Sequence, residues 1–446
     1  MESSGNSTKF CYQCGQEIDA SSKFCPNCGA TQQNNSASSY THIPGSNTVD
    51  KINEVRKAAG KTASSFTSTV MKKANELTGE TGEVKLNLKD LFVNVFKKHS
   101  KDEREEIFIC GTKTTTPAES EISASWPKPW LYSRIFILFA ITFIVLSLLV
   151  TFFSNTNALP GMIFIGALAV PFSTLVFFFE VNAPRNTSIF ETIKIFFIGG
   201  VLSLLVTLFL FLFTPSSEMG FIDAIITGIV EEIGKLVIVA YFCKQPNVKH
   251  ILTGMLIGSA VGAGFAVFET AGYAFNFLFT NGWNSMLEVI YLRAALAIGG
   301  HVIWAAISGG ALVLIKKNEK FKKEHIFNIR FLKIFAIPVI LHAVWDMPLP
   351  MVFGLPMVQI ICTILAWVMA LIMINTGLKQ ISTSQTQETP VEETPAEETP
   401  AEETSVEETP AEETPAKETP AKETPVEETP AEGTPVNETV SSGVQE

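Results

Sequence analysis

The residues best suited to chemistry in this sequence stand inside long apolar blocks. Glu231, Glu232 and Lys235 share one block, and Glu269 stands in the next. An ionisable side chain costs about 3 kcal/mol or more at the centre of a bilayer, so such residues usually face one another or a functional cavity. Lys235 follows Glu231 by four residues and Glu232 by three, a helical spacing that lets it pair with either carboxylate and keep it ionised.

Two histidines and an aspartate extend this series in later apolar blocks. His301 stands in one block, and His342 shares another with Asp346. Because His342 and Asp346 are four residues apart, the carboxylate can orient the imidazole and fix its tautomer. Arg293 lies near the outer end of the block that contains His301, and we interpret it as a topological or lipid-facing residue.

Glutamates and histidines of this kind can hydrolyse a peptide bond. The reaction needs an activated water, a group that polarises the carbonyl and a proton donor for the leaving amine. A zinc ion can activate the water, or a glutamate can act as the base without a metal. The structural alternative is a set of packed, hydrogen-bonded histidines beside a neutralised Glu-Lys pair.

A second reactive set is the cysteine unit at the N-terminus. Two Cys-x-x-Cys pairs, each followed by glycine, are separated by ten residues and comprise Cys11, Cys14, Cys25 and Cys28. This spacing predicts a structural Zn²⁺ site with four thiolate ligands, which has no open position for chemistry. The other three cysteines are scattered, so no disulfide framework is predicted. The binding partner of this zinc ribbon is unknown from the sequence, and no nucleic-acid partner is predicted.

The apolar blocks predict an all-α, polytopic membrane bundle of about eight helices, since about 20 apolar residues cross a bilayer. The predicted spans are 135–154, 160–180, 192–213, 221–243, 251–279, 290–315, 331–348 and 353–376. Lys and Arg gather in alternate connecting loops, so the positive-inside rule places both termini in the cytoplasm of a multi-pass cell-membrane protein. The lipid bilayer is therefore a predicted partner.

The helical rise places three of the ionisable residues at one depth. Glu231 and Glu269 lie about 15 Å from the outer ends of their spans, and His301 lies about 16 Å from its own. The same estimate places His342 closer to the outer end of its span, at a depth of about 9 Å. Glycines at 254, 258 and 262 form a small-residue ridge just before Glu269, which favours close packing around a polar centre.

The remaining sequence divides the chain into four parts. We expect the zinc ribbon at 1–31, the membrane domain at 131–380 and a tail at 381–446. Residues 32–130 connect the ribbon to the membrane domain, and we expect them to contain a linker, an amphipathic helix near 49–77 and a membrane-interface stretch. The tail repeats Glu-Thr-Pro-(Ala/Val)-Glu about ten times and carries 18 Glu from position 388 on, against two Lys. The tail therefore carries a charge of −16. Since the net charge of the chain is −11, the rest of the chain carries about +5. We expect the tail to be disordered.

The motifs of the membrane part resemble those of the PrsW family of intramembrane metalloproteases. The stretch from Glu231 to Lys235 is similar to its Glu-Glu-x-x-Lys motif, and Phe265 to Glu269 is similar to its Phe-x-x-x-Glu motif. His301 and His342 fall in the two later spans where that family carries histidines, and the stretch 180–185 is also similar. The resemblance covers roughly residues 130 to 376.

This resemblance implies a membrane endopeptidase that cleaves a membrane-anchored protein, in known members an anti-sigma factor. It also implies kinship with the CAAX-processing membrane proteases, in which a histidine stands at the position of Glu269. The implied roles are Glu231 or Glu232 as base, with the other as ligand or orienter. Glu269, His301 and His342 would be ligands of a possible catalytic Zn²⁺ or donors to the transition state, and Asp346 would support His342. Glu232→Gln is expected to abolish processing without affecting membrane insertion.

Two other classes of protein remain open from the residues alone. A proton-coupled transporter also needs ionisable residues at mid-membrane depth, although no internal repeat supports it here. A non-catalytic membrane receptor, with the zinc ribbon as its output module, is the other alternative.

Overall fold

The computed structural model describes two strands of the N-terminal unit and nearly all of the membrane part. The described residues are 8–10, 17–19, 22–24, 26–27, 69, 72–73, 75–79, 87–214, 220–351 and 354–388. Strands β1 (Thr8–Phe10) and β2 (Glu17–Asp19) pair antiparallel on either side of the first Cys-x-x-Cys pair. The four predicted zinc ligands, most of the predicted amphipathic helix and the repeat tail from 389 on lie outside the described residues.

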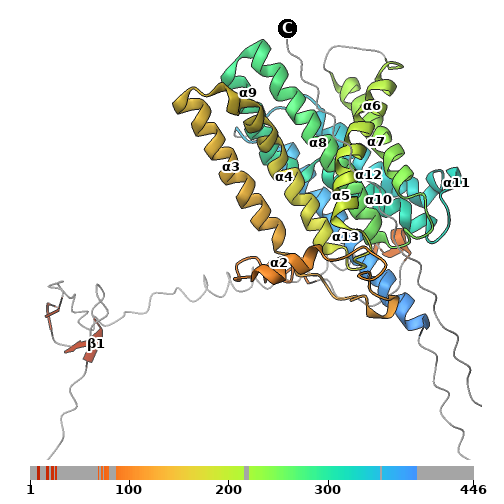
Figure 1. Ribbon diagram of the computed structural model, residues 1–446, viewed down its shortest axis with the longest axis horizontal. Coiled ribbons are helices and arrows are strands. Elements are labelled where there is room, and N and C mark those ends of the chain that lie inside the picture. Colours follow the sequence, from red (N-terminus) through yellow and green to blue (C-terminus); the bar gives the residue numbers. More distant parts are fainter. Residues whose placement is uncertain are drawn as a thin grey trace, which may run out of the picture. The chain divides into compact units, whose positions relative to one another are not determined.

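The membrane part is an all-helical bundle (Figure 1). Its helices are α3 (Leu131–Phe153), α4 (Leu159–Val181), α5 (Ile189–Lys194), α6 (Gly200–Phe211), α7 (Phe221–Phe242), α8 (Ile251–Asn281), α9 (Trp283–Leu296), α10 (His301–Lys316), α11 (Lys323–Ile326), α12 (Ile329–Asp346) and α13 (Met357–Glu388). A π-helical turn, η3 (Ile195–Gly199), joins α5 to α6, and short 3₁₀ turns η1 (Glu119–Glu121), η2 (Thr156–Ala158) and η4 (Ala297–Gly299) lie between other helices.

Six helical segments of the described chain are long and apolar enough to cross a membrane. They are Leu131–Phe153, Thr156–Val181, Ile189–Phe211, Ile251–Asn281, Trp283–Lys316 and Met357–Thr386. The two remaining predicted spans correspond to α7 and α12, which contain four and three charged residues respectively. These two helices pack against each other and against α10, and Glu231, Glu232 and Lys235 of α7 are buried inside the bundle rather than exposed to lipid. The prediction of an all-α membrane bundle is confirmed, and the count of about eight spans is roughly supported.

The predicted span 290–315 lies within the candidate span Trp283–Lys316, but this segment is not one continuous helix. Helix α9 ends at Leu296, the 3₁₀ turn η4 follows, and α10 begins at His301. Two adjacent glycines at 299 and 300 weaken the helix here, because glycine is a poor helix former. A side chain at Gly299 would lie 2.1 Å from Thr363 Oγ1, and Trp367 Nε1 of α13 donates to the Ile298 carbonyl at 2.8 Å. Such a break is tolerated within a membrane where neighbouring helices satisfy the freed backbone groups.

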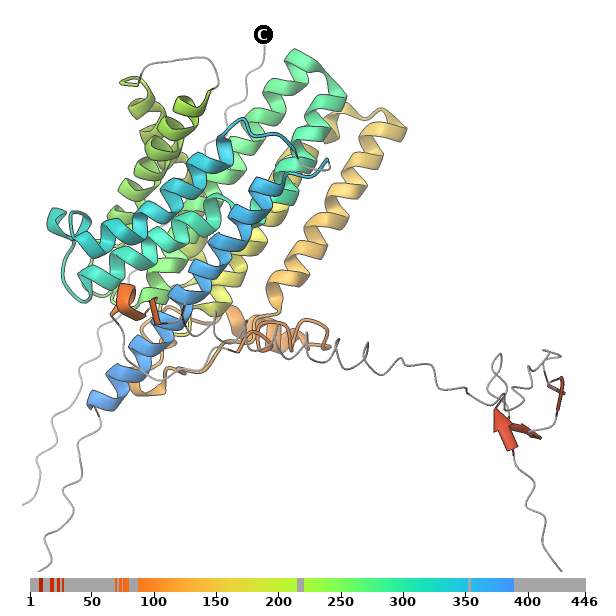
Figure 2. The same ribbon diagram turned by 180° about the vertical axis from the view of Figure 1, so that it is seen from behind.

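Helix α8 is the centre of the bundle and packs most extensively against α10. The predicted glycine ridge forms this contact. A Cβ on Gly258 would lie 2.0 Å from the Ala305 carbonyl oxygen, and one on Gly262 would lie 2.4 Å from that of His301. Seen from behind, α10, α12 and α13 run side by side along this part of the bundle (Figure 2). The glycines therefore set the distance between α8 and the first turn of α10.

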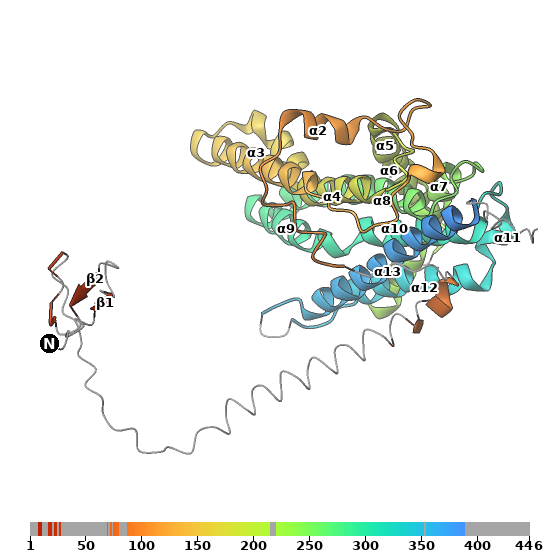
Figure 3. The same ribbon diagram turned by 90° about the horizontal axis from the view of Figure 1, so that it is seen from below.

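The stretch 87–130, with α2 (Lys101–Phe108), covers one end of the bundle (Figure 3). Glu180 at the end of α4 accepts hydrogen bonds from the backbone amides of Trp130, Leu131 and Tyr132 at 2.8, 2.8 and 2.9 Å. Its carboxylate thus caps the first turn of α3, where a negative charge is favourable. His99 stacks on Trp130 with ring centroids 3.6 Å apart. These contacts hold the stretch next to the start of the first span.

Candidate active site

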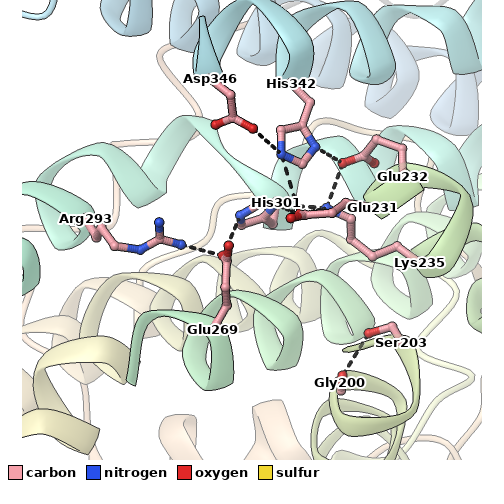
Figure 4. Close-up of polar contacts among 10 residues, drawn as sticks. All are labelled: Gly200, Ser203, Glu231, Glu232, Lys235, Glu269, Arg293, His301, His342 and Asp346. Atoms are coloured by element: carbon pink, nitrogen blue, oxygen red, sulfur yellow. Dashed lines mark hydrogen bonds and ion pairs between the residues drawn. The ribbon is translucent and has the colours of Figure 1, made fainter. Parts of the chain in front are cut away.

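Four helices bring their ionisable residues together in the interior of the bundle (Figure 4). Helix α7 can approach its neighbours closely because it carries glycines at the contacts. A Cβ on Gly228 would lie 2.7 Å from the Ala343 backbone nitrogen of α12, and one on Gly234 would lie 2.2 Å from Thr207 Oγ1 of α6. The first of these contacts places the glutamates of α7 opposite His342, the neighbour of Ala343.

Glu232 makes two close polar contacts within the cluster. Its Oε1 lies 2.7 Å from Lys235 Nζ and 2.9 Å from His342 Nδ1, and its side chain is 0% exposed. A buried carboxylate is stable only when it is paired and hydrogen-bonded. Glu232 therefore neutralises Lys235 and anchors the His342 ring.

Glu231 faces the centre of the cluster with a free oxygen. Its Oε2 lies 3.5 Å from His342 Nε2, 3.7 Å from Lys235 Nζ and 4.0 Å from His301 Nδ1. Although this oxygen is buried, it has no hydrogen-bond partner among the described residues. A buried carboxylate oxygen that faces two imidazoles without a hydrogen bond is suited to binding a cation or a water.

His301 is held from its other side by α8 and α9. Its Nε2 lies 3.0 Å from Glu269 Oε2, and the same oxygen forms a salt bridge with the guanidinium of Arg293. Arg293 also donates from Nε to Thr270 Oγ1 at 2.9 Å and lies over the Tyr273 ring, 4.7 Å from its centroid. The prediction that Arg293 is a topological or lipid-facing residue is therefore wrong. Its long side chain reaches from α9 to α8, a contact that the position of a residue within its own span cannot reveal.

Asp346 and two aromatic side chains complete the site. Asp346 Oδ2 lies 3.3 Å from His342 Nε2, so the predicted contact is present, and the Asp346 side chain is 34% exposed. Trp304 lies against His342 with ring centroids 4.5 Å apart, and Lys235 Nζ lies 4.4 Å from the centroid of Phe265. Apolar walls of this kind lower the local dielectric constant and so strengthen the charge interactions beside them.

All seven predicted site residues thus lie in one cluster. The group that could hold a metal ion, however, differs from the predicted set of Glu269, His301 and His342. Within the described chain, one ligand atom each from Glu231, His301 and His342 lie within 4.8 Å of one another. Glu269 contacts the opposite nitrogen of the His301 ring, so it orients that ring from behind instead of joining this group.

Comparison with known proteins identifies the family of the membrane part. Residues 157–375 match the family described as PrsW family intramembrane metalloprotease. This membrane part belongs to the PrsW family. Protease PrsW from Halalkalibacterium halodurans is 27% identical over 184 residues, which are 40% of this chain and 80% of that relative. Residues 10–31 match a zinc-ribbon domain. No solved structure matches this chain.

Membership in the PrsW family confirms the prediction of a membrane protease and of the family that the motifs resemble. All seven predicted site residues and Arg293 lie inside the PrsW region, whereas α3 and the N-terminal unit lie outside it. The zinc-ribbon match likewise confirms the prediction of a zinc ribbon at the N-terminus. The chain is thus a multi-pass membrane protein with a zinc ribbon before its PrsW domain.

Proposed function

We propose that the PrsW domain is an intramembrane endopeptidase that cleaves a membrane-anchored protein with a water molecule activated at Glu231. The observation that carries this proposal is the buried Oε2 of Glu231, which faces His301 and His342 without a hydrogen bond within the described residues. A general base or a metal ligand needs such an available oxygen within reach of its partners. The cluster lies within the helical bundle, which suits a substrate that is itself in the membrane.

The residues present fit a divalent metal ion. One carboxylate and two imidazoles are the donor set of many zinc hydrolases, and Glu231, His301 and His342 would hold the ion. Carboxylates behind both imidazoles supply the usual second contacts: Glu269 for His301 and Glu232 for His342. When bound, zinc would lower the pKa of its water and polarise the scissile carbonyl.

The other residues have positioning roles in this proposal. Glu232 holds the His342 ring and balances the charge of Lys235. Lys235 Nζ also lies 2.9 Å from His301 Nδ1, so its ammonium and a metal ion would compete for that nitrogen. Asp346, whose side chain is 34% exposed, contacts His342 Nε2 and would support that ring from the solvent side.

The division of the chain into ribbon, interface segment, PrsW domain and acidic tail is part of the proposal, as is the cytoplasmic location of both termini. An anti-sigma factor or a similar single-pass regulator is the class of substrate that we propose. Its membrane helix would enter the bilayer beside the PrsW domain, and its released fragment would carry the signal.

A cleavage assay on a reconstituted single-pass substrate tests the function. We expect Glu231→Gln to lower cleavage at least about 100-fold, because it removes the proton-accepting or metal-binding oxygen. We expect its melting temperature to be unchanged or raised, since that oxygen makes no hydrogen bond in the described structure. Glu232→Gln should lose both activity and stability, because it leaves Lys235 buried without its closest partner.

Glu288→Gln on α9 is the matched control, since Glu288 is exposed on a helix of the same domain. It should keep wild-type cleavage. Full activity of Glu231→Gln would contradict the proposed centre. Full stability of Glu232→Gln would contradict the distinction between the two glutamates.

A further inference from the structure

Arg293 and His301 bind the same atom of Glu269 from two sides. Both the guanidinium and His301 Nε2 contact Oε2 of that carboxylate. The two residues are eight positions apart, which is about 12 Å along a continuous helix. The break at η4 separates α9 from α10, so that a residue on each segment reaches the same oxygen.

The contacts of His301 determine its tautomer. Lys235 Nζ lies 2.9 Å from His301 Nδ1, and an ammonium can only donate a hydrogen bond. Nδ1 must therefore accept, and the ring proton is on Nε2, where it is donated to Glu269. This leaves Nδ1 as the nitrogen that faces Glu231. A carboxylate behind an imidazole commonly fixes the tautomer in this way at metal and catalytic sites.

The position of Glu269 depends in turn on Arg293. The carboxylate is buried, with its side chain 14% exposed, and Arg293 is the cation bonded directly to it. Arg293 is itself fixed by the hydrogen bond to Thr270 and by the Tyr273 ring. A guanidinium with several directed contacts holds a carboxylate in one orientation, which a more flexible ammonium does less well.

We propose that Arg293 is a positioning residue of the protease: it orients Glu269, which fixes His301 with Nε2 protonated and Nδ1 directed at Glu231. This inference rests on the proposed function, in which His301 Nδ1 serves the reaction. Arg293 acts through Glu269 and does not touch the reacting atoms.

A double-mutant cycle on the full-length protein tests whether Arg293 acts through Glu269. Arg293→Gln should lower both substrate cleavage and the Zn²⁺ affinity of the membrane site about 10- to 100-fold, the usual effect of losing a second contact behind a ligand. Arg293→Gln combined with Glu269→Gln should be no worse than Glu269→Gln alone, and Arg293→Lys should recover part of the loss. Additive losses in the double variant, or wild-type behaviour of Arg293→Gln, would overturn the proposal.

¹⁵N NMR of histidine-labelled protein separates this inference from the proposed function. The His301 signal, assigned by its loss in His301→Asn, should report Nε2–H in the metal-free wild type and a mixture of tautomers in Arg293→Gln. Arg134→Gln is the matched control, since Arg134 donates to the Lys97 carbonyl outside the site, and it should leave the signal unchanged. If the wild type binds no zinc at the membrane site, the metal-dependent mechanism is rejected. The tautomer of His301 in Arg293→Gln still tests whether Arg293 is a positioning residue. An unchanged tautomer in Arg293→Gln would reject that role.

Discussion

Glu231 and Glu232 are neighbours in the sequence but have different surroundings in the bundle. Successive residues of a helix point about 100° apart, so one carboxylate faces Lys235 and the Nδ1 of His342 while the other faces the space between two imidazoles. The Glu-Glu-x-x-Lys spacing allows Lys235 to pair with either glutamate. Packing of α7 against α12 decides between them, because it places His342 Nδ1 at Glu232.

A second pair of titrating residues lies outside the membrane spans. Glu119 Oε1 lies 2.7 Å from His250 Nε2, and Lys249 lies 2.9 Å from the other oxygen. Burial alone would raise the pKa of Glu119, but the hydrogen bonds from His250 and Lys249 outweigh it and hold that pKa below 4.5. Burial holds the pKa of His250 below 6.5, with Glu119 opposing the shift. The pair thus joins a neutral imidazole to an ionised carboxylate.

This pair predicts an acid-sensitive link between the interface segment and α8. Both folded pKa values lie below the unfolded ones, so the unfolded chain binds more protons and stability falls as the pH falls. The contribution of His250 is fully present above about pH 6.5 and declines below it, and that of Glu119 declines below about pH 4.5. We expect the melting temperature to drop between pH 7.5 and 5, and His250→Gln to flatten this drop. An equally steep drop in the variant would show that His250 is not its source.

At the scale of elements, the α8–α10 contact fixes the level of His301. The Gly262 backbone lies directly against the carbonyl of His301, and Gly258 lies against that of Ala305. Any side chain on this ridge would move the first turn of α10, and with it the imidazole. The break at η4 matters in the same way, since it makes His301 the first residue of a helix rather than a residue inside one.

Gly262→Ala is expected to cost about 1–3 kcal/mol through overpacking and to lower cleavage by displacing His301. Gly272→Ala on the same helix is the matched control, because a Cβ there meets nothing within 4 Å. That change should be neutral or stabilising by up to about 1 kcal/mol. Thermal melting and the cleavage assay measure both variants. Equal behaviour of the two would mean that the ridge does not position the site.

At the scale of the whole molecule, the chain combines a zinc ribbon and a PrsW domain. The ligands that we propose differ between them: four cysteine thiolates in the ribbon, and a carboxylate and two imidazoles in the membrane group. Four thiolates leave no open coordination position, so only the membrane site is suited to catalysis. The two sites should therefore lose metal independently.

Metal content of the full-length protein checks this independence. We expect about two zinc ions per chain in the wild type. Cys11→Ser with Cys14→Ser should remove the ribbon zinc and keep cleavage in the reconstituted assay, whereas His301→Ala should remove the other ion and abolish cleavage. Cys362→Ala, which changes a buried cysteine of α13, is the control and should keep both ions. Loss of both ions in either variant would show that the sites depend on each other.

The sequence by itself determined the membrane class, the zinc ribbon, the PrsW family and the seven residues that the structure brings together as a candidate site. It could do so because long apolar blocks, cysteine spacing and ionisable residues within spans are local patterns with strong physical causes. Depth along a helix also placed Glu231 and Glu269 at one level, whereas the depth of His301 was counted along a helix that breaks at η4.

Only the tertiary structure decided which of these residues contact one another and which could bind a metal ion. The replacement of Glu269 by Glu231 among the candidate metal ligands, and the salt bridge from Arg293 of α9 to Glu269, depend on which faces of five helices meet. The break at η4 depends on contacts with α13, more than a full span later in the sequence. Side-chain rotation about a helix and contacts between distant helices are set by packing, so no spacing in a single sequence specifies them.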